Sequence, residues 1–493
     1  MSLIRTIKVH WAKLHFWASR IPLYHLTLVS LSKRKISNKL NNTFPSEYSV
    51  DVISQSQVSI LKCTGRPVLI KNIPTFLYSN DFSDEEKSEL HSFEWISVLN
   101  LNIDRRWYLP MQQNITFWIE KFSKLDKLSW NIVNVSERIY NWIMQYNLIS
   151  QISSAKFNAV FIKSLIRQIK FAKRLLYLPM KVSEKLRLIR AIAIGSSALN
   201  DKKSLFKSIR ELSFFLEVVN CAKSCETPQE ILIVLRCLID IQSIILLYQK
   251  KVPREISDNI SKLATIIKTI RHSDGGISIF RSEFTPSPSY IDALLARVKN
   301  DNSLLIHPNY LRFQSFGGSL FIDIKNRYLP IEFSTGPQRI ILGTYLYFSD
   351  SKLLFSGKNK IDHEIYKDKS NSWFNGKSEF IVNDHDVTFE KKLYINKLGM
   401  DIRCEEIIST ESFNILHCII LPFKTDITML EYQNGFSMDL KNGERWIWNF
   451  DRSVSLSFDF GKNTIINGNL QKISVLSLRT ISSNRVRWSM KKV

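Results

Sequence analysis

The spacing of apolar residues changes near residue 275, and this change limits the folds that the chain can adopt. Before residue 275 apolar residues recur every three to four positions, as in 157–176, where the opposite face is rich in Lys and Arg. This spacing is typical of amphipathic helices that bury one face. The sequence therefore predicts an all-α part with little strand. Its further helices are expected at 90–101, 115–122, 136–149, 186–199, 205–219 and 256–270.

After the segment 272–276 apolar residues alternate with polar ones at every second position. Residues 320–325, 453–460 and 485–490 show this pattern, which is typical of β-strands. Pairs that contain glycine, common in tight hairpin turns, separate the strands. We therefore expect a C-terminal antiparallel β-sandwich. Its turns are expected at Asn375-Gly376, Asn434-Gly435, Asn442-Gly443, Gly461-Lys462 and Asn467-Gly468.

A chain of 493 residues is too long for one ordinary core, so two or three domains are expected. Residues 1–84 are expected to form a basic arm and a cap region, with a few strands in 51–73. The helical domain is expected over 85–290. The sandwich is expected over 305–493.

The chain is strongly basic, with 68 Lys and Arg, 45 Asp and Glu, and a formal net charge of +23. Such a field attracts polyanions: nucleic acid, anionic lipid headgroups or an acidic polysaccharide. A coding bias toward Lys, Ile and Asn explains the excess equally well. The sequence has no zinc-finger spacing, RNP-like aromatic strand or basic-region heptads, so no nucleic-acid partner is expected.

Two segments bear on membrane contact. Residues 1–46 carry eight Lys and Arg and no acidic residue, without the apolar run and cleavage site of a signal peptide. Their apolar stripe would suit an anionic membrane surface, although packing of this helix on its own domain is the commoner outcome. The apolar stretch 231–248 holds Arg236 and Asp240, which favours a buried helix over a membrane span. The stripe consists of Trp11, Leu14, Trp17 and Ile21.

The six cysteines predict neither a disulfide framework nor a metal site. Cys221 and Cys225 lie four apart on a helical stretch, with no histidine nearby to complete a metal site. Disulfide scaffolds are typical of small secreted domains, so reduced, buried thiols are expected. No P-loop, dinucleotide fingerprint, nucleophile elbow or zincin helix is present. We expect no metal and no cofactor.

Six short motifs follow one another along most of the chain from about residue 85. They are LHSFEW at 90–95, ERIYNW at 137–142, RHSDGG at 271–276, HPNYLRF at 307–313, IEFSTG at 331–336 and VRW at 486–488. In order and spacing they resemble the heparinase II/III family, in the branch common in α-proteobacteria. The resemblance implies an (α/α) toroid, then a β-sandwich, and a polysaccharide lyase of the cell envelope or periplasm. The cytoplasm is the alternative location.

The chemistry that the resemblance implies is β-elimination at a uronic acid. A lyase neutralises the sugar carboxylate, removes the C5 proton and protonates the departing O4. Tyr and His suit the proton transfers when the site tunes their pKa values. Asn, Arg or protonated His suit the carboxylate, because they donate to the charge that grows in the transition state. An acidic polysaccharide is therefore the expected partner.

His272, Asp274 and Tyr310 are the catalytic candidates. Gly275 and Gly276 permit backbone angles that would place His272 and Asp274 at the mouth of the cleft. A His beside a carboxylate can act as an acid–base, or it can be a helix C-terminal residue favoured by the dipole. In the family the neighbourhood of Tyr310 faces the toroid, which makes Tyr310 the candidate proton donor or acceptor.

Arg138, Asn141 and Trp142 are the candidates for substrate binding. They lie about one helical turn apart and can share a face. In a functional interpretation Arg138 and Asn141 lie in the cleft and Trp142 stacks on a sugar ring. In a structural interpretation Trp142 belongs to the core. Glu332 and Arg339 are expected to form an inter-strand polar pair.

Four polar segments of the family are replaced in this chain. Three of them usually supply histidines to the site, and the fourth has an Asp-Gly-Gly-His-like pattern. Their loss predicts weak elimination activity. The alternative function is a catalytically inactive protein that binds an anionic glycan or a membrane surface. The replaced segments are 326–328, 347–352, 417–422 and 221–225.

Overall fold

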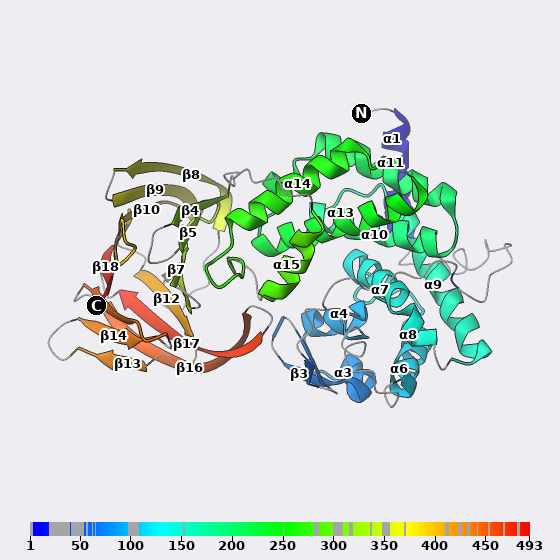
Figure 1. Ribbon diagram of the computed structural model, residues 1–493, viewed down its shortest axis with the longest axis horizontal. Helices are drawn as coiled ribbons and strands as arrows, with labels where there is room; N and C mark the ends of the chain where they lie inside the picture. Colours follow the sequence, from blue (N-terminus) through cyan, green and yellow to red (C-terminus); the bar gives the residue numbers. More distant parts are fainter. Residues whose placement is uncertain are drawn as a thin grey trace. The chain divides into compact units, whose positions relative to one another are not determined.

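The computed structural model has helices followed by antiparallel sheets, as the change in spacing predicts (Figure 1). The chain divides into two compact units: a helical unit, Met1–Ala264 with Ser289–Asn302, and a sheet unit, Thr265–Pro288 with Ser303–Val493. The expected domain boundaries, the toroid and the sandwich stay predictions. The structure describes residues 3–18, 40, 54–55, 58–61, 63–64, 66–96, 108–150, 153–249, 251–280, 285–298, 309–314, 319–335, 338–347, 355–368, 371–409, 414–422, 426–430, 434–440, 442–451, 454–466, 469–480 and 484–493.

The helical unit begins with α1 and a small antiparallel sheet, which agrees with the strands expected in 51–73. The helix expected over 90–101 is wrong at residue 93, because Phe93 is left-handed (φ 61°) and ends α4. The helices are α1 (Leu3–Ala18), η1 (Ile70–Asn72), α3 (Ile73–Tyr78), α4 (Asp84–Ser92), α6 (Tyr108–Lys121), α7 (Ile132–Met144), α8 (Tyr146–Ser150), α9 (Ala155–Leu175), α10 (Val182–Ala198), α11 (Lys202–Val218), α12 (Cys221–Ser224), α13 (Pro228–Tyr248), α14 (Arg254–Thr269) and α15 (Pro288–Ala296); the strands are β1 (Ser54–Gln55), β2 (Val58–Ile60) and β3 (Pro67–Leu69).

Local sequence signals fix where several helices begin. Ser83 accepts from the Glu86 amide, and the Glu86 side chain accepts from the Ser83 amide, which is a capping box at the start of α4. At the start of α13 the Thr227 hydroxyl accepts from the Glu230 amide, and Pro228 occupies the first turn.

Helix α10 is buried along almost its whole length and packs on α7, α9, α11 and α13. By length and composition α13 could cross a membrane, but 61% of its most apolar window is buried within the protein. Its Arg236 and Asp240 also take part in an ion-pair cluster described below. These contacts agree with the buried helix that the sequence predicts.

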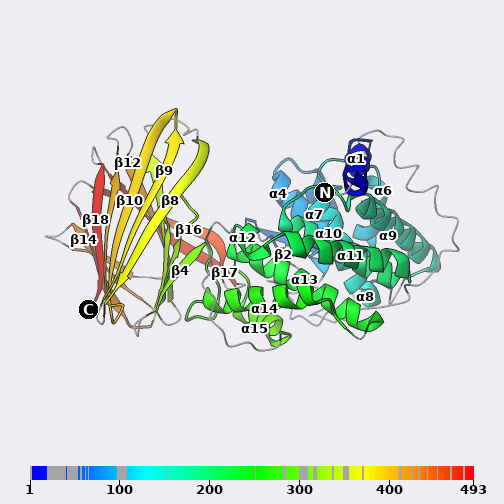
Figure 2. The ribbon, with the colours of Figure 1, turned by 90° about the horizontal axis from the view of Figure 1, so that it is seen from above.

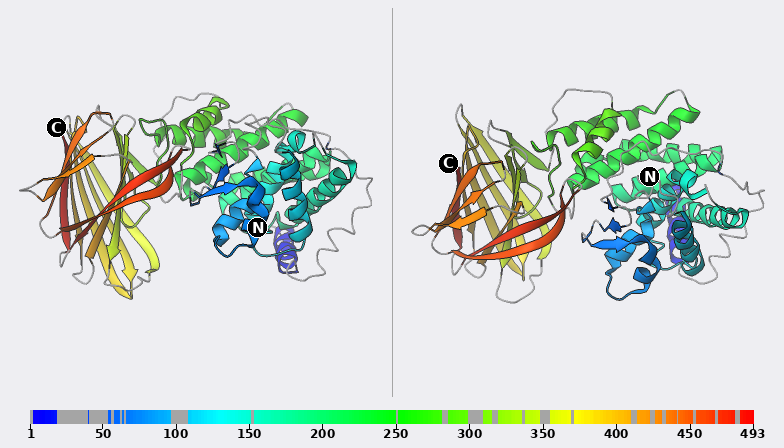
Figure 3. Two further views of the ribbon diagram at one scale, coloured as in Figure 1. Left: turned by 90° about the horizontal axis from the view of Figure 1, so that it is seen from below. Right: turned by 60° about the horizontal axis from the view of Figure 1, so that its bottom comes forward.

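The sheet unit holds two antiparallel sheets. The eight-stranded sheet has the order β13-β14-β15-β18-β11-β10-β9-β8, and the seven-stranded sheet the order β16-β17-β12-β7-β6-β5-β4. Strands β8, β9 and β10 lie side by side (Figure 2), and β16 and β17 form a long hairpin (red in Figure 3). The strands are β4 (Tyr310–Gln314), β5 (Ser319–Asp323), β6 (Ile331–Thr335), β7 (Gln338–Tyr347), β8 (Phe355–Lys367), β9 (Asn371–Val382), β10 (His385–Asn396), β11 (Asp401–Ile408), β12 (Asn414–Pro422), β13 (Asp426–Met429), β14 (Gly435–Asp439), β15 (Arg445–Phe450), β16 (Val454–Ile466), β17 (Asn469–Thr480) and β18 (Arg485–Lys492).

One hydrophobic core serves both sheets. Phe333 of β6 and Trp446 of β15 belong to different sheets, and their rings meet edge to face at 5.3 Å. On β10 and β11 every second side chain points into this core, so the intervening side chains lie on the opposite face of the sheet. That opposite face is called the outer face below.

Only some of the Asn-Gly pairs lie in the hairpin turns that they were expected to form. Asn442-Gly443 does connect β14 to β15, with a φ of 82° at Gly443. Asn375-Gly376 is not a turn but lies inside β9, where a Cβ on Gly376 would come within 2.4 Å of Leu329 Cδ1. Glycine is needed there for close packing. The turn is formed instead by Asn383-Asp384, whose φ angles of 48° and 62° suit these residue types.

The other expected turns have mixed outcomes. Gly461-Lys462 lies inside β16, at a register shift between Phe460 and Lys462, so this expectation is wrong. Asn434-Gly435 leads from the β13–β14 connection into β14. Residues 467–468 lie outside the described residues. Among the described residues, Cys63, Cys221, Cys225, Cys237 and Cys404 are free thiols.

Candidate functional site

His272 and Asp274 lie in a tight turn after α14. The His272 amide donates to the Gly276 carbonyl at 2.8 Å, and Gly275 has a φ of 81°, the left-handed conformation that glycine adopts without strain. The Asp274 carboxylate accepts from the Gly276 amide at 2.9 Å. Gly275 therefore has the backbone conformation for which the sequence predicts glycine, and Asp274 helps to close the turn.

The His272 ring is fully buried against strand β6. Its Nδ1 lies 2.8 Å from Ser334 Oγ, and its Nε2 lies 3.1 Å from Glu332 Oε1. The second oxygen of Glu332 accepts from the Ile279 amide at 2.8 Å. We call His272, Glu332 and Ser334 the His272 cluster. Glu332 and Ser334 lie two residues apart on β6, and the Glu332 carboxylate has no exposed surface.

Hydrogen bonding explains how such a carboxylate is tolerated. A buried charge is costly unless it is paired and hydrogen-bonded. With a proton on Nε2 the His272 ring donates to Glu332, and its Nδ1 shares a hydrogen bond with Ser334. Ser278 Oγ lies 3.2 Å from the same Nε2, so both ring nitrogens have partners. A ring held in this way transfers a proton to or from a ligand only after one of these partners moves away.

Sequence reasoning did not identify Glu332 and Ser334 as partners of His272. Glu332 was expected to pair with Arg339, whose side chain lies outside the described residues, so that pair stays a prediction. Glu332 and Ser334 lie 60 and 62 residues after His272 in the sequence. Only the fold brings them together.

Tyr310 begins β4 in the same unit and is 3% exposed. Its ring is stacked on Phe280, with a centroid distance of 5.6 Å and an interplanar angle of 9°. Across the sheet Tyr310 is opposite Asp323. Phe280 follows the His272 turn by four residues, which ties Tyr310 to the same segment.

Arg138 and Asn141 share one face of α7 and bind the end of α4. Arg138 Nη1 donates to the carbonyls of His91 and Ser129 at 2.9 and 3.0 Å, and Asn141 donates to the carbonyl of Ser92 at 3.0 Å. Carbonyls at a helix C-terminus lack partners within the helix and attract cations. Both side chains are buried and act as a cap for α4.

Trp142 has no exposed surface. It meets Phe93 and Trp118 edge to face, at 5.3 and 5.8 Å, and lies 4.8 Å from Phe161. The guanidinium of Arg138 lies over Trp118 at 3.9 Å. The three substrate-binding candidates are thus together in one packed cluster, and direct contact with a sugar stays a prediction that requires this packing to open.

A second charged cluster joins three helices and was not predicted. Arg190 of α10 donates from Nη2 to both oxygens of Glu137 on α7, at 2.7 and 2.8 Å, and its Nη1 lies 3.3 Å from Asp240 of α13. Arg187 Nε lies 3.5 Å from Glu137, and Arg236 Nε lies 4.0 Å from Asp240. We call these five residues the arginine cluster.

Tyr140 packs against the arginine cluster, with the Arg190 guanidinium over its ring at 3.8 Å. Burial, helped by Asp240, raises the pKa of Tyr140 well above its usual range, so its hydroxyl stays protonated. Burial also raises the pKa of Glu137, but Arg190 and Arg187 outweigh this effect and lower it overall. With three guanidiniums and two carboxylates the cluster has an excess of one positive charge.

The sequence did contain a signal for this cluster. Arg187 and Arg190 lie three apart on α10, and Arg236 and Asp240 lie four apart in an apolar stretch of α13. Charges on faces that pack into a core need partners. The motif at 137–142 supplies one of them, Glu137, which lies beside the residues chosen from the sequence.

Similarity to known proteins lies in the fold. The chain superimposes on a crystal structure of heparinase III with a TM-score of 0.58 and 11% sequence identity, covering 98% of this chain and 91% of that one. A mutant heparan sulfate lyase from Pedobacter heparinus gives a TM-score of 0.46 at 11% identity, with 97% and 88% coverage. No protein-family model and no curated protein matches the chain. The first of these likenesses shows a shared arrangement of helices and antiparallel sheets.

Proposed function

We propose that this chain is a polysaccharide-lyase-like protein that binds an acidic, uronate-containing glycan. It cleaves this glycan by β-elimination weakly or not at all. The fold similarity to heparinase III supports the glycan class. The observation that carries the reduced activity is the state of His272, whose two ring nitrogens both contact side chains of β6. A general base needs a position within reach of the proton that it removes.

The arginine cluster supports the acidic nature of the ligand. Arg187 and Arg236 retain 20% and 24% exposure, so part of the excess positive charge reaches solvent. The net charge of +23 adds long-range attraction for a polyanion. Arg236→Ala should therefore weaken glycan binding. The control is Arg254→Ala, which removes a similar i,i+4 pair, with Asp258, from an exposed site on α14.

The test of the proposed function combines turnover with binding. Wild-type protein is incubated with heparin, heparan sulfate, alginate and hyaluronan, and ultraviolet absorbance reports the unsaturated uronide that a lyase leaves. We expect little or no product, together with binding that weakens steeply as salt is added. An affinity that does not change with salt concentration, or no binding to any of the four glycans, would contradict the proposal.

Any residual elimination is expected to depend on Tyr310 and His272, with Asp274 holding the turn. One acid–base group is typically worth roughly 10²–10⁴-fold in rate, so Tyr310→Phe should abolish weak turnover while affinity stays within a few-fold. Robust turnover that survives both Tyr310→Phe and His272→Gln would place the chemistry elsewhere. The narrower family branch and a cell-envelope location are part of this proposal, with the cytoplasm as the alternative.

A membrane-surface protein is the second candidate function. Ile7, Trp11 and Leu14 are exposed on α1 at the spacing of one helical stripe, near Lys8 and Lys13. The wild type should then co-sediment with vesicles of anionic lipid, and Trp11→Glu should abolish this. A reporter fused after residue 46 that stays soluble and cytoplasmic would remove this candidate and the envelope location together.

A further inference from the structure

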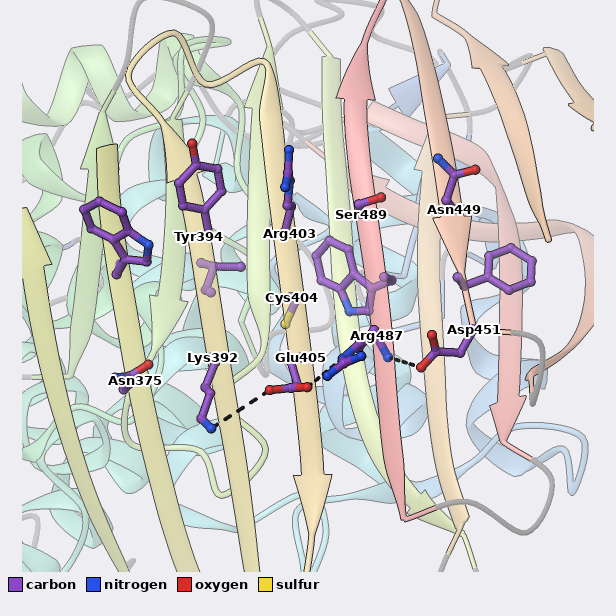
Figure 4. A pocket seen from close by; sticks show the side chains of 14 residues that line it. Asn375, Lys392, Tyr394, Arg403, Cys404, Glu405, Asn449, Asp451, Arg487 and Ser489 are labelled. Carbon is purple, nitrogen blue, oxygen red and sulfur yellow. Dashed lines mark hydrogen bonds and ion pairs between the residues drawn. The ribbon is translucent and has the colours of Figure 1, made fainter. Parts of the chain in front are cut away.

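The outer face of the eight-stranded sheet carries a row of aligned side chains across six neighbouring strands. Tyr366 is opposite Trp373, and Trp373 is opposite Tyr394, with ring centroids 5.3 and 5.7 Å apart. The row continues through Arg403, Ser489 and Asn449, whose side-chain types have donor groups (Figure 4). Its members are Tyr366, Trp373, Tyr394, Arg403, Ser489 and Asn449, each directly opposite the next.

A second row runs parallel to the first, two residues along each strand. Asn375 is opposite Lys392, Lys392 is opposite Glu405, and Glu405 is opposite Arg487. Beyond Arg487 the Asp451 carboxylate accepts from the Arg487 amide at 2.9 Å. Neighbouring strands lie roughly 4.8 Å apart, so five steps give a polar and aromatic surface about 24 Å long.

The charges on this face are arranged with the cations outermost. Arg403 holds Asp401 with two hydrogen bonds, of 3.0 and 2.7 Å, and Arg485 and Arg487 both donate to Glu405. The side chains of Arg403 and Arg487 are 65% and 58% exposed, whereas those of Asp401 and Glu405 are only 16% and 19% exposed. The guanidiniums cover the carboxylates, so the surface presents positive charge to solvent.

Ion pairing keeps the Glu405 carboxylate charged. Burial raises the pKa of Glu405, but hydrogen bonds from Arg487 and Arg485 outweigh it and lower the pKa overall. The arginines are thereby held in fixed positions, with less side-chain freedom to lose when an anion binds.

The two rows line one hollow of about 600 Å³. Trp373, Tyr394 and Arg403 come from the first row, and Asn375, Lys392 and Arg487 from the second (Figure 4). Its volume falls within the usual range of ligand pockets, roughly 300–1,000 Å³. We call this hollow the outer-face platform.

We propose that the outer-face platform binds a stretch of acidic polysaccharide, separately from the His272 and arginine clusters. The Trp373 and Tyr394 rings line the hollow, where they stack on sugar rings, and the Arg403 guanidinium lies 5.5 Å over the Tyr394 ring. Arg403, Arg487 and Lys392 meet the acidic groups. The row of sites across successive strands suits a linear chain rather than a compact ligand. The inference takes its ligand class from the proposed function.

Charge and shape together favour a glycan over an apolar partner. A protein interface or a lipid tail would cover aromatic rings with apolar groups and leave the neighbouring guanidiniums and amides without partners. A polysaccharide has acidic groups and hydroxyls for these side chains and C–H faces for the rings. Among the residues that line the hollow, three cations, Lys392, Arg403 and Arg487, accompany two carboxylates, Glu405 and Asp451, which leaves an excess of one positive charge.

The experiment measures binding of heparin oligosaccharides to the full chain by titration calorimetry at low salt. The double variant Trp373→Ala/Tyr394→Ala should raise Kd at least about tenfold, because one stacked ring is typically worth roughly 1–3 kcal/mol in comparable stacking sites. Trp373→Phe/Tyr394→Phe keeps two ring faces and should stay within a few-fold of wild type. Unfolding midpoints verify that all variants fold.

Charge is tested with a matched pair of arginines. Arg403→Ala should weaken binding several-fold, whereas Arg445→Ala, which removes a similar exposed pair with Asp439 outside the hollow, should not. Uncharged dextran should bind much more weakly than heparin.

The outcomes separate the two proposals. Unchanged heparin affinity in Trp373→Ala/Tyr394→Ala and in Arg403→Ala, together with wild-type binding, overturns the platform alone. Loss of binding only in Arg236→Ala assigns the glycan to the arginine cluster and overturns the platform as well. A wild type that binds no acidic glycan overturns both the platform and the proposed function.

Discussion

The His272 cluster and the outer-face platform lie in the same unit but differ in how much of their polar side chains is exposed to solvent. In the His272 cluster the ring and the carboxylate have no exposed surface and bind one another. On the platform Arg403 and Arg487 are paired and still more than half exposed. Burial thus decides whether a charged side chain stabilises the fold or remains available to a ligand.

The buried residues lie in the family-like motifs, whereas the exposed platform residues lie outside them. The motifs at 137–142, 271–276 and 331–336 supply the buried groups: Arg138, His272 and Glu332. The platform residues Trp373, Lys392 and Arg403 belong to none of the family-like motifs. The family-like motifs therefore supply packing, and the proposed platform lies outside them.

The largest expected effect is on stability, from His272→Ala. Removal of one partner from a buried ion pair or hydrogen-bonded pair typically costs roughly 3–5 kcal/mol, because the remaining charge is left uncompensated. His272→Gln keeps an N–H donor for Glu332 and should lose much less. Urea unfolding gives the change, and hydrogen exchange in peptides of β6 locates it.

Two variants complete this test. Adding Glu332→Leu to His272→Ala removes the uncompensated carboxylate and should recover much of the loss. His385→Ala removes an exposed histidine at the start of β10 and should change little. Equal stability of His272→Ala and wild type would show that the buried pair contributes nothing and would end the contrast with the platform.

The second effect is a pH dependence in the helical unit. Trp118 Nε1 donates to His91 Nδ1 at 3.0 Å, and burial, with smaller contributions from Arg138 and Lys87, lowers the pKa of His91 from 6.5 to about 3. Between these values the unfolded chain binds a proton that the folded chain does not. The free energy of unfolding should therefore fall as pH falls below 6.5, by up to about 1.4 kcal/mol per pH unit.

His91→Gln isolates this contribution. A glutamine oxygen can accept from Trp118 and does not titrate, so the variant should lose stability less steeply between pH 6.5 and pH 4. Urea unfolding at several pH values measures the slopes, with hydrogen exchange in α4 and α7 as the local readout. His363→Gln, at an exposed position on β8, is the control. Parallel slopes for His91→Gln and wild type would contradict the assignment.

Much of the fold could be predicted from the sequence because side-chain spacing is a local property. The helix over 186–199 and the strand over 485–490 follow from periods of 3.6 and 2 and correspond to α10 and β18. The position of Gly376 inside a strand could not be predicted from local spacing. A glycine lies there because its backbone packs closely against Leu329, which is far away in the sequence.

The candidate site was harder to predict because its partners come from distant segments. His272 was identified, but its contacts with Glu332 and Ser334 depend on how the turn packs against β6. On α7 the sequence pointed to Arg138 and Asn141, whereas Glu137 joins the arginine cluster and Tyr140 packs against it. Helical spacing shows which residues share a face, but not which face meets a charge.

The smallest expected effect is on the stability of the platform. Arg403→Ala removes two hydrogen bonds to Asp401, yet the pair is exposed, and solvent-exposed ion pairs contribute little to stability. We expect the unfolding midpoint to move by less than about 2 °C, and Arg445→Ala, which breaks a similar pair with Asp439, to behave alike. Differential scanning calorimetry measures both. A midpoint lowered by Arg403→Ala as much as by His272→Ala would mean that the platform arginines hold the sheet together, and the contrast between a structural cluster and an available surface would fail.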